Sequence, residues 1–359
     1  MKFLKVQSYA QACSQDRAEL TPGGAFLCAP PELPVPDLGR PEFFYANIPT
    51  YGPLQYSYPP RYIYSLPGAS IVSNTYAVIT QNQVLIRDSY CNNIPQLEQS
   101  GVLKVRAADA QTQVAAYTPN HSPRRLHTSV FLPVSFWYRN YHHWLIETVP
   151  LLIRYKNCLP QPDTRLIMSG SLAPFHLETL QLLGLKDRVL TYPTEGLWCP
   201  TLYVPELGIY APDHLFSVRN AFLENARLRP KLLRKIYISR VDSNSRRVLN
   251  ENELKPILEK EGYEWICLEG MSLTAQIKCF SEAQIIIGPH GAGLSNMLFS
   301  HTGTRVIEFL PEDQVNHCFW IMANILGHRY TYLTGRVKNA QRDMYISPAV
   351  LQRLLSAIE

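Results

Sequence analysis

Hydrophobic and polar positions change their spacing several times between residues 129 and 193. Short apolar runs predict buried strands at SVFLPV (129–134), TRLIMSG (164–170) and RVLTYP (188–193). Between them, apolar residues recur every three or four positions, which predicts helices at NYHHWLIETVPLLIRYKN (140–157) and FHLETLQLLGL (175–185). Strands that alternate with helices in this way favour a parallel α/β domain.

A second series of the same kind runs from residue 235 to residue 311. Its apolar runs predict strands at KIYISR (235–240), EWICLEG (264–270), QIIIG (284–288) and TRVIEFLP (304–311). Helices are expected at NENELKPILEKEG (250–262) and SLTAQIKCFSEA (272–283), and another begins at GAGLSNMLF (291–299). Asn250 and Glu253 have the spacing of a capping box. We expect a compact unit of these strands and helices, followed by an amphipathic helix at SPAVLQRLLSAIE (347–359).

The other stretches are less regular. Residues 1–60 are rich in Pro, Gly and Tyr, which predicts extended segments and loops. Residues 69–88 predict two or three strands with a turn near Gln81, and residues 92–117 are ambiguous between a linker and a helix. Residues 195–216 predict loops with one strand, and HLFSVRNAFLENARL (214–228) predicts a helix that leads out of the first domain.

These patterns divide the chain into parts of different character. We expect an irregular N-terminal segment over 1–68 that packs on the first domain. An N-terminal α/β domain over 69–228 and a C-terminal Rossmann-like domain over 229–340 follow, and a C-terminal helix occupies 341–359.

Composition and charge narrow the class of protein. The 359 residues are 46% hydrophobic and 18% charged, which is typical of a globular protein with a sizeable core. The formal net charge of +5 is mild and like charges do not cluster in blocks, so nucleic-acid binding is not indicated. The basic excess fits a phosphate site equally well, and it leaves peripheral contact with an anionic membrane open.

Cysteine spacing and hydropathy favour a cytoplasmic protein. The 8 cysteines form no C-x-x-C pair and no zinc-ligand spacing, so we expect buried, reduced thiols. No apolar run reaches the roughly 18 residues that a membrane span needs. We therefore expect a soluble protein.

The stretch IIIGPHGAGLSNMLF (285–299) raises the question of a ligand. A buried strand ends at Gly288, and Gly291 and Gly293 follow just before a helix. Backbone N–H groups at a helix start have no partner within the helix, and together with the helix dipole they favour a phosphate. Glycine lets the ligand approach the backbone closely. Such glycines are also common in ordinary tight turns, and His290 alone fits a structural hydrogen-bonding residue as well.

Charged residues near the ends of the neighbouring strands strengthen the phosphate interpretation. Arg240 ends the strand KIYISR, and Arg246 and Arg247 follow in a polar loop. Guanidinium groups recognise phosphates through forked hydrogen bonds. Glu308, near the end of the strand TRVIEF, is a candidate acceptor for ribose hydroxyls. A solvated basic loop for the arginines, and a helix cap or surface partner for Glu308, remain the plainer alternatives, but together these residues favour a nucleoside diphosphate site.

Several other motifs are missing. The glycine spacing is neither the dinucleotide-binding G-x-G-x-x-G nor the G-x-x-x-x-G-K-[ST] loop, which disfavours an NAD-dependent oxidoreductase. His290 to Gly293 is similar to the oxyanion loop of esterases, but the segments that begin at Gly270 and Gly293 both lack the last glycine of a G-x-S-x-G elbow. We therefore disfavour an esterase.

The linked segments YISRVDSNSRRVLNENEL, IIIGPHGAGLSNMLF and RVIEFLP, with NYHHWLIETVPLLIRY upstream, resemble glycosyltransferase family 61, formerly a domain of unknown function. The resemblance spans roughly residues 71–311. It implies a GT-B architecture, in which two Rossmann-like domains face a cleft. It also implies transfer from a nucleotide sugar, usually a UDP-sugar, with inversion at the anomeric carbon. Because we find no membrane anchor, the chain looks most like bacterial members that build surface polysaccharides, including capsules.

The resemblance also assigns candidate site residues. The C-terminal domain supplies the donor site: Arg240, Arg246, His290, Gly291, Ala292, Gly293, Leu294, Ser295, Asn296 and Glu308. Asn140, His143 and Glu147 lie on the acceptor side, in the N-terminal domain; of the pair His142 and His143 we prefer the second, which precedes Trp144. The partners that it implies are a UDP-sugar and a glycan or lipid-linked acceptor.

Residue spacing adds two expectations about mechanism. No D-x-D metal motif occurs, so we expect metal-independent stabilisation of the leaving diphosphate by Arg240, Arg246 and backbone amides, with no cofactor. Asn140, His143 and Glu147 are spaced by three and four residues and share one helix face. His143 oriented by Glu147 is a candidate base near neutral pH, and Glu147 itself is the competing candidate. A structural His–Glu pair, and a non-catalytic protein that binds nucleotide sugars or glycans, remain alternatives.

Overall fold

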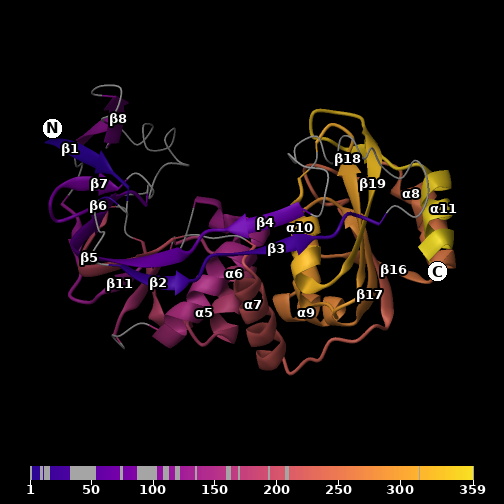
Figure 1. Cartoon of the computed structure of the whole chain (residues 1–359), viewed down its shortest axis with the longest axis horizontal. Helices are drawn as coiled ribbons and strands as arrows, with labels where there is room; N and C mark the ends of the chain where they lie inside the picture. Colours follow the sequence, from indigo (N-terminus) through magenta and orange to yellow (C-terminus); the bar gives the residue numbers. More distant parts are fainter. Residues whose placement is uncertain are drawn as a thin grey trace. The chain divides into compact units, whose positions relative to one another are not determined.

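The computed structural model describes most of the chain and divides it into two compact units. Unit 1 comprises Met1–Gly23 and Pro59–Ile209, and unit 2 comprises Gly24–Tyr58 and Tyr210–Glu359. We describe each unit separately (Figure 1). The described residues are 2–8, 11, 17–32, 54–72, 76–86, 103–107, 113–117, 122–133, 136–158, 163–168, 170–192, 195–206, 210–314 and 316–358.

Unit 2 is built on a 6-stranded sheet with the order β16-β15-β17-β18-β19-β20. All neighbouring strands pair in parallel except β19 and β20, which pair antiparallel. The strands are β15 (Arg234–Ser239), β16 (Tyr263–Cys267), β17 (Ala283–Pro289), β18 (Arg305–Pro311), β19 (Arg329–Val337) and β20 (Met344–Tyr345). The strands predicted from QIIIG and TRVIEFLP become β17 and β18, which are buried almost throughout.

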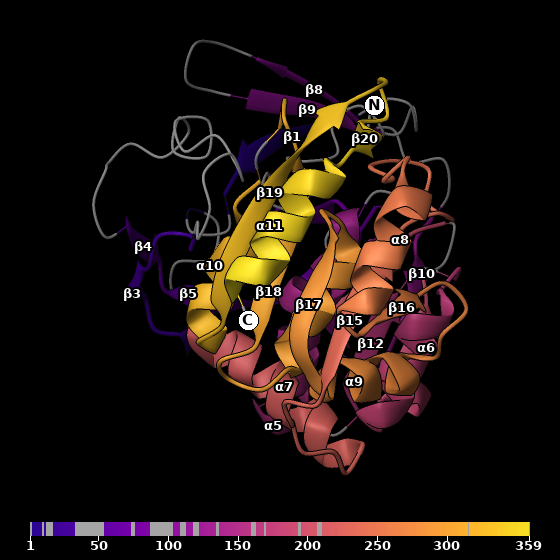
Figure 2. The same ribbon diagram turned by 90° about the vertical axis from the view of Figure 1, so that its right-hand side faces the viewer.

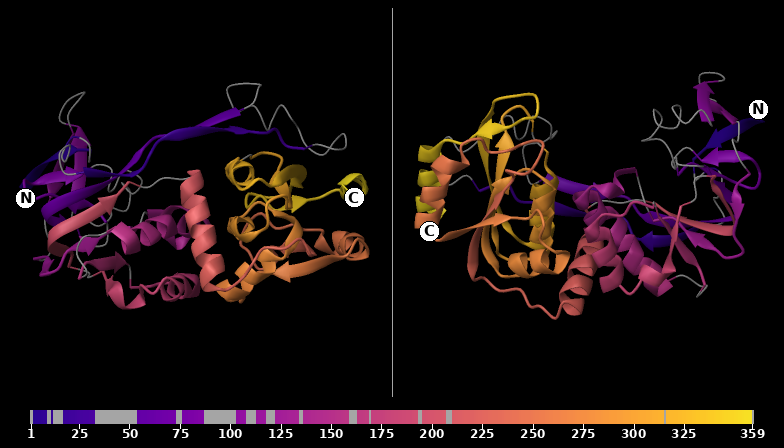
Figure 3. Two further views of the ribbon diagram at one scale, coloured as in Figure 1. Left: turned by 60° about the horizontal axis from the view of Figure 1, so that its bottom comes forward. Right: turned by 180° about the vertical axis from the view of Figure 1, so that it is seen from behind.

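Helices cover both faces of this sheet. On one face, α8 (Glu251–Lys260) and α11 (Pro348–Ile358) lie side by side (Figure 2). Their leucines pack on alternate residues of the strands: Leu254, Leu258, Leu351, Leu354 and Leu355 against Tyr237, Ile285, Ile287, Ile307, Phe309 and Leu333. The other face is covered by α9 (Leu273–Ser281), α10 (Cys318–Leu326) and the 3₁₀ helix η5 (Ala292–Phe299), with α7 (Pro212–Asn225) packed against η5 and α10 (Figure 3).

The sequence patterns did not predict α10 or β19. Helix α10, CFWIMANIL, is buried on most sides, so it lacks the polar face that makes a helix visible as a periodic pattern. It leads into β19, which extends the parallel part of the sheet beyond the expected strands. The unit is therefore larger than the β-α-β-α-β-loop-α-β arrangement that we expected.

Unit 1 contains a 12-stranded sheet in which parallel and antiparallel pairs are mixed. Part of it is a parallel core with the order β13-β12-β11-β14. These strands are β11 (Val130–Phe131), β12 (Arg165–Met168), β13 (Val189–Thr191) and β14 (Leu197–Pro205). The helical elements between them are η2 (Phe136–Arg139), α4 (Tyr141–His143), η3 (Trp144–Thr148), α5 (Val149–Cys158), α6 (Pro174–Leu182) and η4 (Lys186–Arg188). The predicted alternation of strands and helices is confirmed here.

The rest of this sheet is mainly antiparallel. Its strands are β1 (Lys2–Gln7), β2 (Arg17–Thr21), β5 (Arg61–Ile71), β6 (Val78–Ile79), β7 (Val84–Ile86), β8 (Leu103–Ala107), β9 (Gln113–Tyr117) and β10 (Arg124–Arg125). The strands and the turn expected over 69–88 are present in β5, β6 and β7. The helix that we considered within 92–117 is wrong for the residues described there, because β8 and β9 pair antiparallel.

The N-terminal segment contributes to both units. Strands β1 and β2 belong to unit 1, whereas β3 (Gly24–Cys28) and β4 (Leu54–Tyr58) form a 2-stranded sheet in unit 2. Within unit 2, Glu32 accepts hydrogen bonds from Arg305 Nη1 at 2.7 Å and Arg329 Nε at 2.9 Å. Much of the tyrosine-rich stretch over 44–64 lies outside the described residues.

Asparagine side chains lie at the starts of two helices. Asn140 is the N-cap of α4, and its Oδ1 accepts a hydrogen bond from the His142 amide at 2.9 Å. Helix α8 also begins where expected, but its capping box is wrong. The Asn250 side chain instead bonds the backbone of Ile346, with Nδ2 donating to the carbonyl at 2.8 Å and Oδ1 accepting from the amide at 3.0 Å.

The expectations about membrane spans and thiols can be compared with the described residues. No helix among them is long and apolar enough to cross a membrane. Cys28, Cys199, Cys279 and Cys318 are buried free thiols, and Cys267 is a partly exposed one.

Candidate functional site

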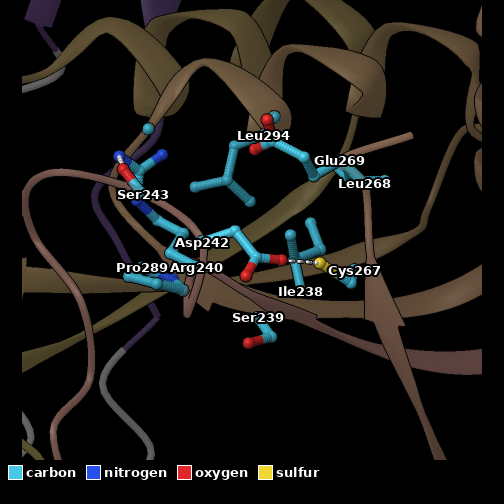
Figure 4. A pocket seen from close by; sticks show the side chains of 12 residues that line it. Ile238, Ser239, Arg240, Asp242, Ser243, Cys267, Leu268, Glu269, Pro289 and Leu294 are labelled. Atoms are coloured by element: carbon cyan, nitrogen blue, oxygen red, sulfur yellow. Dashed lines mark hydrogen bonds between the residues drawn. The ribbon is translucent and has the colours of Figure 1, made fainter. Parts of the chain in front are cut away.

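A pocket lies at the carboxyl ends of three neighbouring strands of unit 2. If β15 to β19 are numbered one to five along the chain, their order in the sheet is 2-1-3-4-5. In open α/β sheets, ligands bind beyond the carboxyl ends of the strands where this order reverses, which is here between β15 and β17. The pocket, of about 180 Å³, occupies this place (Figure 4). It is lined by Ile238, Ser239, Arg240, Asp242, Ser243, Cys267, Leu268, Glu269, Pro289, Gly291, Gly293 and Leu294.

Arg240 is the cation of the pocket. Its Nη2 donates to Ser243 Oγ at 2.6 Å and to the Ser245 carbonyl at 3.1 Å, while its Nε is buried without a hydrogen-bond partner among the described residues. Burial, and then the nearby Arg246, lower the pKa of Arg240 to about 10. No carboxylate among the described residues forms an ion pair with it, so this guanidinium suits an anionic ligand.

Arg246 and Arg247 have different environments. Arg247 Nη2 forms an ion pair with the fully buried Asp343 at 2.6 Å. Arg246 forms no ion pair within the described part of the chain, and its Nε is buried without a hydrogen-bond partner there. Burial lowers the pKa of Arg246. The resemblance assigned Arg246 to the donor site, and this stays a prediction: Arg246 is not among the residues that line the pocket, although it lies close enough to Arg240 to lower its pKa.

The glycine turn brings its backbone against Arg240. A Cβ atom on Gly291 would lie 1.9 Å from Arg240 Nη1, so only glycine leaves room for the guanidinium in this position. The helix that follows is the 3₁₀ helix η5, not the α-helix that we expected. Asn296 Nδ2 donates to the Gly293 carbonyl at 3.1 Å, and such side-chain bonds compete with an α-helical ladder. The first amides of η5 still lack acceptors within the helix.

Other predicted residues of the turn have different positions. Leu294 lines the pocket, and Ala292 begins η5. Ser295 and Asn296 are fully buried, and Asn296 Nδ2 also donates to Gln276 Oε1 at 2.9 Å. These two side chains shape the turn beneath the pocket.

His290 and Glu308 form a buried pair that Tyr330 completes. Glu308 is inaccessible to solvent; its Oε1 lies 2.5 Å from His290 Nδ1, and its Oε2 accepts from the Tyr330 hydroxyl at 2.5 Å. Burial, and then Glu308, raise the pKa of Tyr330 well above its usual value, so the phenol stays protonated and donates. Both Glu308 oxygens are thus engaged within the unit. This arrangement orients the His290 ring, and Glu308 is not among the residues that line the pocket.

Two carboxylates in the pocket were not singled out from the sequence. Asp242 follows β15 and Glu269 follows β16, and both side chains are exposed. Cys267 Sγ donates to Asp242 Oδ2 at 3.0 Å, and this bond, then burial, raises the pKa of the thiol. Figure 4 shows Arg240 and Ser243 on one side of the pocket and Cys267 and Glu269 on the other. An acid just after a strand was the available signal in the sequence.

The second group of candidate residues lies in unit 1. If β11 to β14 are numbered one to four, their order is 3-2-1-4, and η2 and α4 follow the carboxyl end of β11 at the point where that order reverses. His143 Nδ1 lies 2.7 Å from Glu147 Oε1. The intervening turn is the π-helix η3, a form that is often found at functional sites. The structure thus brings the predicted pair together.

Neighbouring side chains distinguish the two histidines. His142 is buried, whereas the His143 side chain keeps 33% of its surface exposed. The ring of the half-exposed Trp137 stacks on His143, with 6.0 Å between their centroids. Asn140 uses its side-chain oxygen as the helix cap, so its position is set by the helix.

A family model and a known protein match parts of the chain. Residues 141–307 match the family model described as Glycosyltransferase 61. Over 101 residues the chain is 34% identical to the EGF domain-specific O-linked N-acetylglucosamine transferase of Drosophila melanogaster, covering 27% of this chain and 19% of that protein. The chain thus spans about a fifth of the length of this relative. The resemblance inferred from the sequence motifs is confirmed for residues 141–307.

Proposed function

We propose that this chain, which carries a glycosyltransferase 61 domain over residues 141–307, transfers a sugar from a nucleoside diphosphate, with UDP as the carrier, to a hydroxyl group of a glycan or lipid-linked acceptor. The unit 2 pocket binds the carrier, and the His143–Glu147 pair belongs to the acceptor side. The GT-B arrangement of two Rossmann-like domains is part of this proposal.

The observation that carries the proposal is the cationic end of the pocket. Arg240 is largely buried beside Gly291, and neither Arg240 nor Arg246 forms an ion pair among the described residues. An isolated buried charge is costly unless it gains a partner. A diphosphate supplies that partner by accepting forked hydrogen bonds from the guanidinium groups and further bonds from the amides at the start of η5.

The opposite end of the pocket suits the ribose. Carboxylates accept hydrogen bonds from sugar hydroxyls, and Asp242 and Glu269 line the pocket beyond strands β15 and β16. We assign the ribose to these residues in place of Glu308, whose oxygens already bond His290 and Tyr330. Glu308 then acts on the site through His290.

The proposed sugar transfer uses the arginines of unit 2 and the His143–Glu147 pair of unit 1. The acceptor oxygen attacks the anomeric carbon, the bond from that carbon to the diphosphate breaks, and the carbon is inverted. Arg240 and Arg246 stabilise the negative charge that develops on the departing diphosphate. If His143 Nδ1–H donates a hydrogen bond to Glu147 Oε1, the unprotonated Nε2 of His143 can take the proton of the acceptor hydroxyl.

Inversion and a role in surface polysaccharide synthesis rest on the resemblance. Metal independence rests on the missing D-x-D motif, and a location in the cytoplasm or at the membrane periphery rests on the cysteine spacing, hydropathy and charge. The Drosophila relative is named for N-acetylglucosamine transfer, so UDP-N-acetylglucosamine is the first donor to test. Inversion is read from the anomeric configuration of the product, and metal independence from activity that survives EDTA.

The first experiment is a thermal-shift screen of the full chain against UDP, GDP, CMP and their sugars. We expect UDP and UDP-sugars to stabilise the protein, by about 2.7 kcal/mol at a ligand concentration of 100 times Kd. Arg240→Ala removes the cation at the end of β15 and is expected to abolish most of this shift.

The matched control is Arg234→Gln at the other end of the same strand. Arg234 pairs with Glu264 and lies outside the pocket, so this variant should keep the full UDP shift even if its own melting temperature falls. The proposal is wrong if none of these nucleotides stabilises the wild-type protein, or if Arg240→Ala binds UDP as tightly as the wild type does.

A further inference from the structure

The Asp343 carboxylate accepts hydrogen bonds from the loop that carries Arg246 and Arg247. It lies beyond the region that matches the family model and has no solvent exposure. Its Oδ1 accepts from the Arg247 amide at 2.9 Å, and its Oδ2 accepts from Arg247 Nε at 3.1 Å and Nη2 at 2.6 Å. Asn339 Nδ2 donates to the same oxygen at 2.9 Å, so both carboxylate oxygens are satisfied. The carboxylate thus holds both the backbone and the side chain of Arg247.

Backbone bonds join the same two segments on either side of Arg247. The Arg246 amide donates to the Gln341 carbonyl at 3.0 Å, and the Met344 amide donates to the Arg247 carbonyl at 2.8 Å. Val248 and Met344 form an isolated parallel bridge. The loop after β15 is therefore fixed to the turn before β20, although the two are far apart in the sequence.

Arg246 needs this support because its backbone is strained. Its φ angle is +56°, in the left-handed region that residues other than glycine seldom occupy. Such conformations persist where the surroundings over-determine them, and they cluster at functional sites. The Arg246 amide is bonded to the Gln341 carbonyl, and the next amide along the chain, that of Arg247, is bonded to the buried Asp343.

The charges in this loop also distinguish the two adjacent arginines. Arg247 holds the pKa of Asp343 at about 2, so the carboxylate remains ionised at any ordinary assay pH. Asp343 neutralises Arg247 and leaves Arg246 as the loop's cation without an ion pair among the described residues. Arg247 is thereby the anchor of the loop, while Arg246 does not line the pocket itself but lies close enough to Arg240 to lower its pKa.

We propose that Asp343 is a positioning residue for nucleoside diphosphate binding, which acts by anchoring Arg247 so that Arg246 is held in its left-handed conformation beside Arg240. This inference rests on the proposed function, because it takes UDP as the ligand of the arginines. It predicts that removing the Asp343 charge weakens UDP binding even when the variant remains folded.

The experiment is a double-mutant cycle on UDP affinity, measured by isothermal titration calorimetry with the full chain. Asp343→Asn keeps the shape of the side chain and removes its charge. We expect it to weaken UDP binding about tenfold, the size of one lost charge-assisted hydrogen bond. Arg246→Ala should weaken binding by at least as much. In the double variant Asp343→Asn should add nothing, because the residue through which it acts is already gone.

A matched control separates positioning from general destabilisation. Glu264→Gln breaks the Arg234–Glu264 pair, an arginine–carboxylate pair with bonds of 2.7 and 2.5 Å elsewhere in the same sheet, and should leave UDP affinity unchanged. If Asp343→Asn does not fold, Arg247→Met breaks the anchor from its more exposed side, where 42% of the Arg247 side chain is accessible. The same cycle then applies to that variant.

The outcomes of the cycle are distinct. Additive losses in the double variant, or unchanged UDP affinity in both Asp343→Asn and Arg247→Met, overturn the positioning role and leave the proposed function standing. If wild-type protein does not bind UDP at all, the proposed function fails and this inference fails with it.

Discussion

Arg246 and Arg247 are identical in type and adjacent in sequence, yet they differ in what their guanidinium groups contact. A buried carboxylate distant in the sequence, Asp343, pairs with one of them and leaves the other without an ion pair among the described residues. The sequence placed both arginines after a strand end, which was enough to predict a cationic loop. It did not reveal Asp343, because nothing local marks a tertiary partner.

For Glu308 the sequence predicted the position in the sheet, but not the contacts of the side chain. Its place near the end of a strand predicted contact with a ribose, but burial and its bonds to His290 and Tyr330 give it a supporting position. Asp242 and Glu269 also follow strands and do reach the pocket. Position along a strand therefore predicts which edge of the sheet a residue occupies, while its tertiary contacts decide whether its side chain faces the pocket.

His143 gives a prediction about turnover. We expect His143→Ala to lower the rate of UDP release from UDP-N-acetylglucosamine by about 10²- to 10⁴-fold, the usual contribution of a general base, while UDP affinity is unchanged. The measurement is UDP release, paired with calorimetry of UDP binding. His127→Ala, which removes an exposed histidine in the same unit, is the control and should keep full turnover.

The result also decides between the two candidate bases. Full turnover by His143→Ala together with inactive Glu147→Ala would transfer the role of base to Glu147. If both variants and the wild type bind UDP but none releases it from any UDP-sugar, the non-catalytic alternative gains support.

At the scale of elements, the sequence predicted the strands and helices that have a clear apolar run or a clear alternation of buried and exposed positions. Strands β15 to β18 and helices α7, α8, α9 and α11 lie close to their expected positions, because each shows an apolar run or an amphipathic period. Helix α10 escaped prediction because it is buried on most sides. The turn after β17 was predicted, but its 3₁₀ form was not, and no periodic pattern encodes the Asn296 side-chain bonds that accompany it.

Gly291 gives a prediction that belongs to this turn. Gly291→Ala places a methyl group where Arg240 Nη1 now lies, and a flexible guanidinium can move aside. We therefore expect UDP affinity to fall about tenfold or more, since a charge-assisted hydrogen bond is lost, with little change in melting temperature. Calorimetry and thermal unfolding of the same variant check both parts.

The double variant Gly291→Ala with Arg240→Ala provides the internal control. Once the guanidinium is absent, the added methyl group meets no obstacle there, so it should have no further effect on UDP affinity. Unchanged affinity in Gly291→Ala alone would show that the position of Arg240 against the turn does not matter for the ligand.

At the scale of the whole molecule, the predicted α/β class is confirmed, and the described residues form two large sheets, one mixed and one mostly parallel. Each unit contains a parallel core whose strand order reverses once, and the candidate residues follow strands at those reversals. The sequence indicated parallel strands but not their order, which depends on the long-range pairing of segments. The residues that match the family model, 141–307, supply parts of both units, and Asp343 and Tyr330 lie outside them.

The central claim is that the reversal point of the unit 2 sheet binds a nucleoside diphosphate. A crystal structure of the full chain with UDP tests it most directly. We predict the diphosphate within hydrogen-bond distance of Arg240, Arg246 and the amides of Ala292 and Gly293, with the ribose hydroxyls on Asp242 or Glu269. UDP bound elsewhere, or a pocket that stays empty at saturating UDP, would contradict the account.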